Sequence, residues 1–254
     1  MTGGPRDGRI PRLLRRKLAV PERHVSPRTR NLLYVTALVL ALVGAGFFFL
    51  TLSDVLQKDD LATWDEPVNS WFVNQRSEAA TVVMGILATV FGPVTMPIIV
   101  LAVTVIWTIT ARHAWRPLLL AGAMLTGVLL AQVITHLVGR PRPPLNLMLL
   151  GNDSTYSFPS GHVLGASDFL LVGAFLVFSR RNRIGPAIAG FTAAVAGILT
   201  QAASRLYLGY HWLTDSLASI ALSLIVLGAV IALDTWRTTR VPPEPGTGIK
   251  TGNY

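Results

Sequence analysis

The chain has 254 residues, of which 51% are hydrophobic and only 14% are charged. This balance excludes an ordinary soluble domain and indicates a protein that lies in a membrane. The formal net charge is +9, but the basic residues stand in tails and short loops between apolar runs, so we expect them to orient the chain in the bilayer and expect no nucleic-acid partner. The sequence has no cysteine, which excludes disulfides, thiolate metal sites and a cysteine nucleophile.

The N-terminal region is basic, and we expect residues 1–31 to form a cytoplasmic tail. The first apolar run is Leu32–Leu52, and at 1.5 Å per residue it reaches about 30 Å, the thickness of a hydrocarbon core. A cleaved signal peptide is the alternative. The long basic lead-in and the lack of a small-residue cleavage site after the run favour a membrane span.

Residues 53–79 are polar and acidic. Within them Val68, Trp71 and Phe72 recur at helical spacing, which predicts a short helix on the membrane face. An ordinary loop with aromatic anchors explains the same pattern equally well.

The next apolar run, Ala80–Thr110, is long for one span, and Gly92-Pro93 interrupts it. Two spans would each be too short for the hydrocarbon core, so we predict one tilted or kinked helix. Four more spans follow, at Pro117–Val138, Val163–Phe178, Ile184–Ala202 and Leu213–Leu233. The sequence therefore predicts an all-α fold: a six-transmembrane-helix bundle with a short interfacial helix between spans 1 and 2. The membrane domain would cover residues 32–234, and a disordered cytoplasmic tail, rich in proline and glycine, would cover residues 235–254.

The distribution of Lys and Arg sets the predicted orientation. With the N-terminus inside, the inner segments hold 17 of the 22 basic residues and the outer segments hold 5. The positive-inside rule then places both termini in the cytoplasm. Three charged motifs, at residues 140–143, 159–162 and 204–215, all fall on the extracytoplasmic face, which points to one site there.

The third motif offers a nucleophile. His211 and Asp215 are spaced i, i+4 at the start of the last span, so we expect both to project from one helical face. A carboxylate there accepts the proton of one ring nitrogen and leaves the other nitrogen free to attack. Arg205, in the same outer turn, can clamp phosphate oxygens, although an Arg that only extends to the interface is the alternative. Tyr207, Tyr210 and Trp212 are interpreted as interfacial aromatic residues.

The second motif, Pro159-Ser160-Gly161-His162, opens the fourth span. Ser160 suits an N-cap, Gly161 allows close approach, and the free amides and positive helix end attract an anion. His162 would then protonate a leaving oxygen. A plain capping turn is the alternative. Taken together, the histidines, arginines and helix-end amides match the requirements of phosphoryl transfer.

The combined motifs resemble those of the type 2 phosphatidic acid phosphatase family, which is related to the vanadium haloperoxidases. That family carries Lys-x6-Arg-Pro, then Pro-Ser-Gly-His, then Ser-Arg-x5-His-x3-Asp, and the second and third motifs are complete here. The resemblance covers residues 32–234, and it is to the integral-membrane branch of the family. It implies that His211 forms a phosphohistidine, that Asp215 orients it and that His162 is the general acid. It also implies four phosphate-binding residues, namely Arg142, Ser160, Gly161 and Arg205.

The first motif departs from the family pattern. Counted back from Arg142, the position of the family's Lys holds Thr135. Counted back from Arg140, that position holds no basic residue either. His136 is adjacent and could compensate, or it could bond to another span. Asp168 lies about 9 Å below His162 along the helix axis. We hypothesise that Asp168 pairs with His136 or with Gln132 of the third span and so supports the site.

The sequence therefore predicts a metal-independent lipid phosphatase of a bacterial cytoplasmic membrane, with no cofactor and with the bilayer and a lipid phosphate as its partners. Phosphatidic acid, phosphatidylglycerol phosphate and a polyprenyl diphosphate are the candidate substrates. A phosphotransferase that uses the same phosphohistidine, or a non-catalytic lipid-binding or transport protein on this fold, is the alternative. The sequence does not define the oligomeric state.

Overall fold

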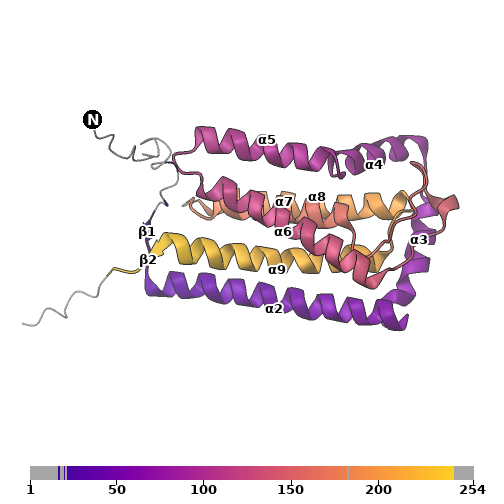
Figure 1. Cartoon of the computed structure of the whole chain (residues 1–254), viewed down its shortest axis with the longest axis horizontal. Coiled ribbons are helices and arrows are strands. Elements are labelled where there is room, and N and C mark those ends of the chain that lie inside the picture. The colour runs from indigo at the N-terminus through magenta and orange to yellow at the C-terminus, as the bar shows by residue number, and fades with distance from the viewer. Residues whose placement is uncertain (1–16, 18–19, 21, 182, 243–254) are drawn as a thin grey trace, which may run out of the picture.

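The computed structural model describes residues 17, 20, 22–181 and 183–242. In this part of the chain, long helices run side by side along the molecule (Figure 1). The first is α2 (Pro27–Gln57), and the later long helices are α4 (Glu78–Val90), α5 (Thr95–Thr110), α6 (Trp115–Val138), α7 (Gly161–Phe178), α8 (Ile184–Tyr207) and α9 (Leu213–Thr238). The predicted all-α fold is confirmed.

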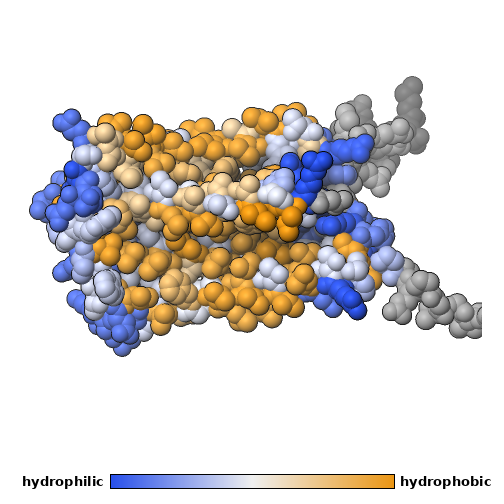
Figure 2. Space-filling view, turned by 180° about the vertical axis from the view of Figure 1, so that it is seen from behind, coloured by the Kyte–Doolittle hydropathy of each residue, from blue (hydrophilic) through white to orange (hydrophobic). Residues whose placement is uncertain are grey.

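The six predicted spans are present when one bent pair is taken as a single span. Five helices are long and apolar enough to cross a membrane, and α4 and α5 add a sixth span that is broken and bent by 54°. The break lies at residues 91–94, where Gly92 and Pro93 stand. On the face seen in Figure 2, an orange apolar band lies between two bluer, polar ends, as a hydrocarbon core requires.

The polar segment after the first span forms two short helices, the 3₁₀-helix η1 (Asp60–Trp64) and the α-helix α3 (Asp65–Asn74). The predicted short helix is therefore present, and the alternative of a plain loop is wrong. α3 lies across one end of the bundle (Figure 1), where it contacts α8 and α9. We call this end, with the loops at residues 139–160 and 208–212, the site end.

The opposite end carries both termini of the described chain. Strand β1 (Arg23–His24) pairs in parallel with β2 (Thr239–Arg240). The last helix reaches Thr238, so ordered structure continues past the predicted start of the C-terminal tail at residue 235. Most of the predicted N-terminal tail, and residues 243–254 of the C-terminal one, lie outside the described residues.

A buried ion-pair cluster joins three helices at the opposite end. Asp234 of α9 forms ion pairs with Arg116 of α6 at 3.0 Å and with Arg180 at 3.5 Å. The indole of Trp115 also donates to Asp234, at 2.9 Å. Because each buried charge has a partner, this cluster fixes the helix ends without leaving an isolated ion in an apolar setting.

Helices α2 and α9 approach each other closely because glycine lines their contact. A Cβ added at Gly44 of α2 would meet the Ala221 carbonyl oxygen at 2.6 Å, and one added at Gly228 of α9 would meet the Ala37 carbonyl oxygen at 2.6 Å. Real Cβ atoms essentially never come closer than 3.0 Å to such atoms. The first and last spans therefore pack backbone to backbone, as small residues permit in membranes.

The α2–α9 contact predicts a position-specific effect of alanine. Gly44→Ala should destabilise the protein, because overpacking typically costs about 1–3 kcal/mol. Gly46→Ala is the matched control, since the same helix leaves open space around Gly46. Thermal unfolding in one detergent would compare the two variants. Equal melting temperatures would contradict the close contact.

Candidate active site

His211 lies in the loop between α8 and α9, with only 2% of its surface exposed. Its Nδ1 faces the Asp215 Oδ2 at 3.3 Å, and the backbone N–H of Trp212 donates to the same oxygen at 2.9 Å. The expectation that both residues project from one helical face is wrong in detail, because α9 begins at Leu213 and His211 precedes it. Asp215 reaches back over the helix N-terminus, so the predicted pair forms nevertheless.

The neighbours of His211 define its tautomer. Arg142 Nη1 lies 3.1 Å from His211 Nε2. A guanidinium can only donate, so Nε2 must present its lone pair there. The ring proton therefore resides on Nδ1 and is donated to Asp215. This arrangement leaves Nε2 as the nitrogen that can attack an electrophile.

Burial also keeps the imidazole neutral. It lowers the pKa of His211 from the ordinary 6.5 to about 4, although the hydrogen bond to Asp215 acts in the opposite direction and nearby Arg205 lowers the pKa further. A neutral ring at pH 7 is the form that can act as a nucleophile. The site is therefore prepared for attack without first losing a proton to solvent.

Arg142 is held by the loop that precedes α7. Its guanidinium donates to the Tyr210 carbonyl at 2.8 Å and to the Thr155 hydroxyl at 2.9 Å, and it pairs with Asp153 at 3.0 Å. These contacts aim the guanidinium at His211 Nε2. An anion attacked by His211 would therefore meet Arg142 at once.

Arg205 and His162 complete a cluster of basic side chains around His211. Arg205 is 4% exposed, and its guanidinium carbon lies 4.6 Å from the centre of the Tyr210 ring. His162 of α7 interacts electrostatically with Arg205, His211 and Arg142. Side chains from three segments of the sequence therefore converge, as the motifs predict.

The start of α7 supplies a helix N-terminus to the same region. Ser160 is the N-cap of α7 and accepts a hydrogen bond from the Val163 N–H at 3.5 Å, so the predicted cap is confirmed. Its own N–H donates to the Asp215 carbonyl at 3.3 Å, which joins α7 to α9. Gly161 is exposed, and a Cβ there would meet nothing within 4 Å. Its amide therefore remains open to an anion.

The hypothesis that pairs Asp168 with His136 or Gln132 is wrong. His136 is exposed, and its Nδ1 bonds the Gln132 carbonyl of its own helix at 2.7 Å. Asp168 is fully buried and packs against Gly127, where an added Cβ would lie 2.0 Å from its Oδ2. Asp168 faces the inside of the bundle and His136 is exposed, so these two side chains do not pair. Thr135 is half-buried in the last turn of α6 and supplies no cation.

Two aromatic residues differ from their predicted role. Tyr207 is 3% exposed and Tyr210 is 6% exposed, so the prediction that they are interfacial anchors is wrong. The Tyr207 hydroxyl donates to the Ser77 carbonyl at 3.0 Å, and the Tyr210 hydroxyl donates to the Gly151 carbonyl at 2.5 Å. Both rings therefore secure loops at the site end.

Arg140 belongs to the first motif, where a basic residue beside a membrane span is common, and the sequence supports at most a supporting role for it. In the structure it turns inward. Arg140 Nη1 donates to Asp215 Oδ1 at 2.6 Å and to the Thr214 hydroxyl at 2.7 Å. No sequence signal distinguishes this Arg from a residue that flanks a membrane helix, because its partners lie about 75 positions later.

An apolar groove of about 590 Å³ leads from the site along the bundle. The broken span lines it with Phe91, Pro93 and Met96, and α7 lines it with His162 and Gly165. The groove therefore joins the polar site end to the apolar flank of the protein.

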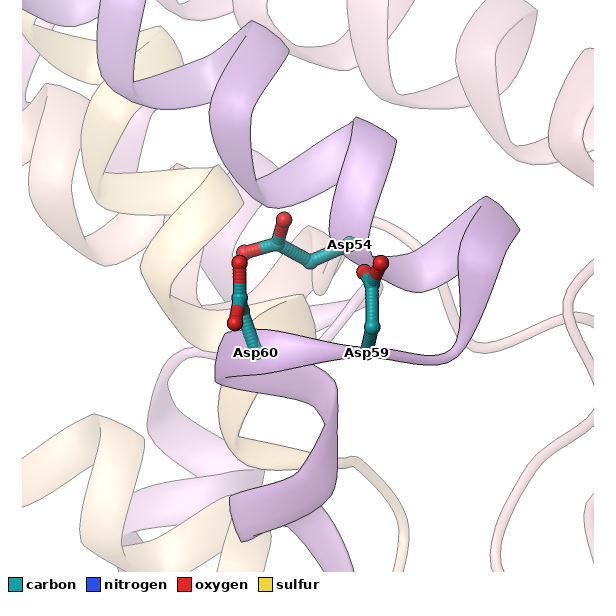
Figure 3. Close-up of side chains that lie close together, drawn as sticks. All are labelled: Asp54, Asp59 and Asp60. Atoms are coloured by element: carbon teal, nitrogen blue, oxygen red, sulfur yellow. The ribbon is translucent and has the colours of Figure 1, made fainter.

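Three carboxylates approach each other at the end of α2. Oxygens of Asp54, Asp59 and Asp60 all lie within 4.8 Å of one another (Figure 3). Asp54 is buried and accepts a hydrogen bond from the Leu61 N–H at 3.4 Å, whereas Asp59 and Asp60 are exposed. Exposed acidic groups of this kind are common without an ion, and the expectation of a metal-independent site stays a prediction.

These features define a membrane-embedded protein with a histidine–arginine site at one polar end. The family model described as the PAP2 superfamily matches residues 116–239. The phosphatidylglycerophosphatase B of Bacillus subtilis is 30% identical over 199 residues, which cover 76% of this chain and 94% of that protein. The chain therefore belongs to the PAP2 superfamily, and the resemblance recognised in its motifs is confirmed.

Two further comparisons agree with this assignment. The phosphatidylglycerophosphatase B of Escherichia coli is 29% identical over 89 residues, or 35% of this chain and 32% of that protein. A crystal structure described as the first transmembrane PAP2 type phosphatidylglycerolphosphate phosphatase, from Bacillus subtilis, has a TM-score of 0.66 and 23% identity. It covers 76% of this chain and 96% of that chain, and it shows the shared fold.

The environment of His211 predicts an acid titration. The imidazole should remain neutral down to a pH of about 4 and gain a proton only below it, because burial disfavours the charged form. An NMR titration of the histidine ring signals, with His211→Ala to assign them, would measure the midpoint. A midpoint at the ordinary 6.5 would show that the site is open to water.

Proposed function

We propose that the protein is an integral membrane phosphatase that removes phosphate from a membrane lipid through a phosphohistidine intermediate. The observation that carries this proposal is the position of His211 Nε2. It presents a lone pair toward Arg142, near Arg205 and His162, and His162 stands at the polar end of an apolar groove.

In the first step, the lone pair of His211 Nε2 attacks phosphorus and the bond from phosphorus to the lipid oxygen breaks. Protonated His162 gives its proton to the departing oxygen, which leaves as a hydroxyl group of the lipid. Arg142, Arg205 and the Gly161 amide hold the phosphoryl oxygens. The proton stays on Nδ1 and is donated as a hydrogen bond to Asp215, whose charge stabilises the positive charge on the phosphorylated ring.

In the second step, water attacks the phosphorus of the phosphohistidine. Neutral His162 takes a proton from that water, and the bond from phosphorus to Nε2 breaks. Inorganic phosphate leaves, Nε2 regains its lone pair, and both histidines return to their starting states. Neither step needs a metal ion for its balance of atoms and charge.

The groove supports a lipid as the substrate. We propose that the groove receives the hydrocarbon chain of the lipid while the phosphate binds between His211, Arg142 and Arg205. Gly161 and Gly165 line it, and a Cβ added at either would meet nothing within 4 Å, so these glycines keep its wall open. Its apolar lining matches an acyl or prenyl chain.

We propose a phosphomonoester, with phosphatidylglycerol phosphate as the first candidate, because the relatives are described as phosphatidylglycerophosphatases. The charge of the site supports this choice over a diphosphate. Thr135 stands where the family has a cation, and Asp153 already neutralises Arg142 at 3.0 Å. We also propose that the site end is extracytoplasmic, since 17 of 22 basic residues lie on the other side.

The phosphatase proposal predicts release of inorganic phosphate from phosphatidylglycerol phosphate by purified protein in detergent, in the presence of EDTA. His211→Ala should lower the rate by at least about 1,000-fold, because the nucleophile is lost. His136→Ala is the matched control, since that histidine is exposed and bonds only its own helix among the hydrogen bonds of the described chain. Phosphatidic acid and a polyprenyl diphosphate, tested in parallel, measure the substrate preference.

Each outcome of that assay has a defined meaning. Release that survives EDTA and disappears in His211→Ala supports the mechanism. Release that EDTA abolishes contradicts metal independence and directs attention to Asp54, Asp59 and Asp60. No release from any of the three lipids by folded protein would contradict the phosphatase proposal itself.

The groove predicts a chain-dependent effect of a bulky residue. Gly165→Phe should fill the groove and slow hydrolysis of a long-chain substrate by about tenfold or more, since one lost apolar contact site costs on the order of 1–3 kcal/mol. Hydrolysis of a short-chain analogue should change little. Gly173→Phe is the matched control, because that glycine also has open space but does not line the groove. Equal losses of rate for the long-chain and the short-chain lipid would show that the hydrocarbon chain does not bind in the groove.

A further inference from the structure

The carboxylate of Asp215 is held from both sides. Its Oδ2 accepts hydrogen bonds from His211 and from the Trp212 N–H, and its Oδ1 accepts one from Arg140 at 2.6 Å. Each oxygen therefore has a defined partner, and the carboxylate cannot rotate without breaking a charge-assisted hydrogen bond. The orientation of the His211 ring depends on this carboxylate.

Arg140 is itself held by a second carboxylate, from the short helix α3. Its Nη2 lies 2.5 Å from Asp65 Oδ2, and its guanidinium carbon lies 5.7 Å from the centre of the Trp212 ring. Arg140 therefore bridges two acids that are 150 positions apart in the sequence. With two acids and one base, the bridge carries a net negative charge beside the His211 imidazole.

Asp65 also fixes the first turn of α9. Its Oδ1 accepts the Thr214 N–H at 2.9 Å, and its Oδ2 accepts the Thr214 hydroxyl at 2.7 Å. Asp65 is 3% exposed, and Thr214 and Asp215 are fully buried. A helix on the membrane surface thus reaches the backbone that carries Asp215, through groups that water does not compete for.

We propose that Asp65 is a positioning residue for the His211 nucleophile, acting through Arg140 and Asp215. This inference rests on the proposed function. In the absence of the Asp65 charge, Arg140 has one acid left, and it draws the Asp215 carboxylate toward itself. The hydrogen bond at Nδ1 then weakens, and the ring loses the single tautomer that presents the Nε2 lone pair to phosphorus. Asp65 touches no substrate in this scheme, so binding is preserved while turnover falls.

The first test is steady-state kinetics of Asp65→Asn with the lipid that the protein hydrolyses. We expect kcat to fall by about tenfold to a hundredfold, since small displacements of a catalytic group have effects of this size, with KM within about threefold of wild type. Asp65→Glu should recover part of kcat. The control is Asp234→Asn, which removes a buried carboxylate paired with arginine at the opposite end, and which should leave kcat unchanged in folded protein.

A double-mutant cycle tests the route through Arg140. If Asp65 acts through Arg140, the double variant Asp65→Asn/Arg140→Gln should have the same kcat as Arg140→Gln alone, within about threefold. Losses that multiply would overturn the route. An unchanged kcat in Asp65→Asn, or a raised KM with unchanged kcat, would overturn the positioning role.

A third measurement separates this inference from the proposed function. The ¹⁵N chemical shifts of the His211 ring report its tautomer without any turnover. We expect the Nδ1–H form in wild type and a mixture of tautomers in Asp65→Asn. If wild-type protein releases no phosphate and the mixture still appears, the proposed function fails and the positioning role stands. An identical tautomer in both proteins overturns the positioning role whatever the activity.

Discussion

The paired carboxylate of Asp215 is the interaction on which the site end depends. Burying a charge beside a hydrocarbon core is costly unless it has a partner. Asp215 meets this requirement twice, through His211 and through Arg140. Its backbone carbonyl also accepts the N–H of Ser160. One residue therefore joins His211, the first motif and the start of α7.

The same constraint extends to the charge of the whole site. Three arginines and three aspartates gather there, and they balance when both histidines are neutral: Arg140, Arg142, Arg205, Asp65, Asp153 and Asp215. In the proposed mechanism, a phosphate that enters beside Arg142 and Arg205 adds negative charge to this balanced set. Protonation of His162 would then restore the balance and create the acid that the leaving oxygen requires. Substrate binding and activation of the acid are then one electrostatic event.

The sequence predicted the parts of this structure that depend on local patterns. Apolar runs of membrane length located the spans, and Gly92-Pro93 predicted the kink that the structure shows as a 54° bend. Charge placement predicted that the three motifs share one face. Their side chains do converge at the site end, because helix ends that are adjacent in a bundle bring distant loops together.

The parts that the sequence did not predict depend on long-range pairing. Asp65 looked like one of several acids in a polar segment, and nothing near it in the chain indicates Arg140 or Thr214. Asp168 does face α6, the helix of its predicted partners, but it packs against Gly127 in the bundle interior and not against Gln132 or His136. Tyr207 and Tyr210 were assigned to the interface by composition, whereas tertiary hydrogen bonds bury them.

The groove between the broken span and α7 has a consequence for how the protein encounters its substrate. It meets the apolar flank of the bundle, so a lipid that binds there as proposed would arrive by diffusing in the plane of the bilayer. The relevant abundance is then the number of substrate molecules per neighbouring lipid, not per litre of solution. Adding inert lipid or detergent at constant total substrate would dilute that surface and slow the encounter, while concentrating the whole suspension would not accelerate it.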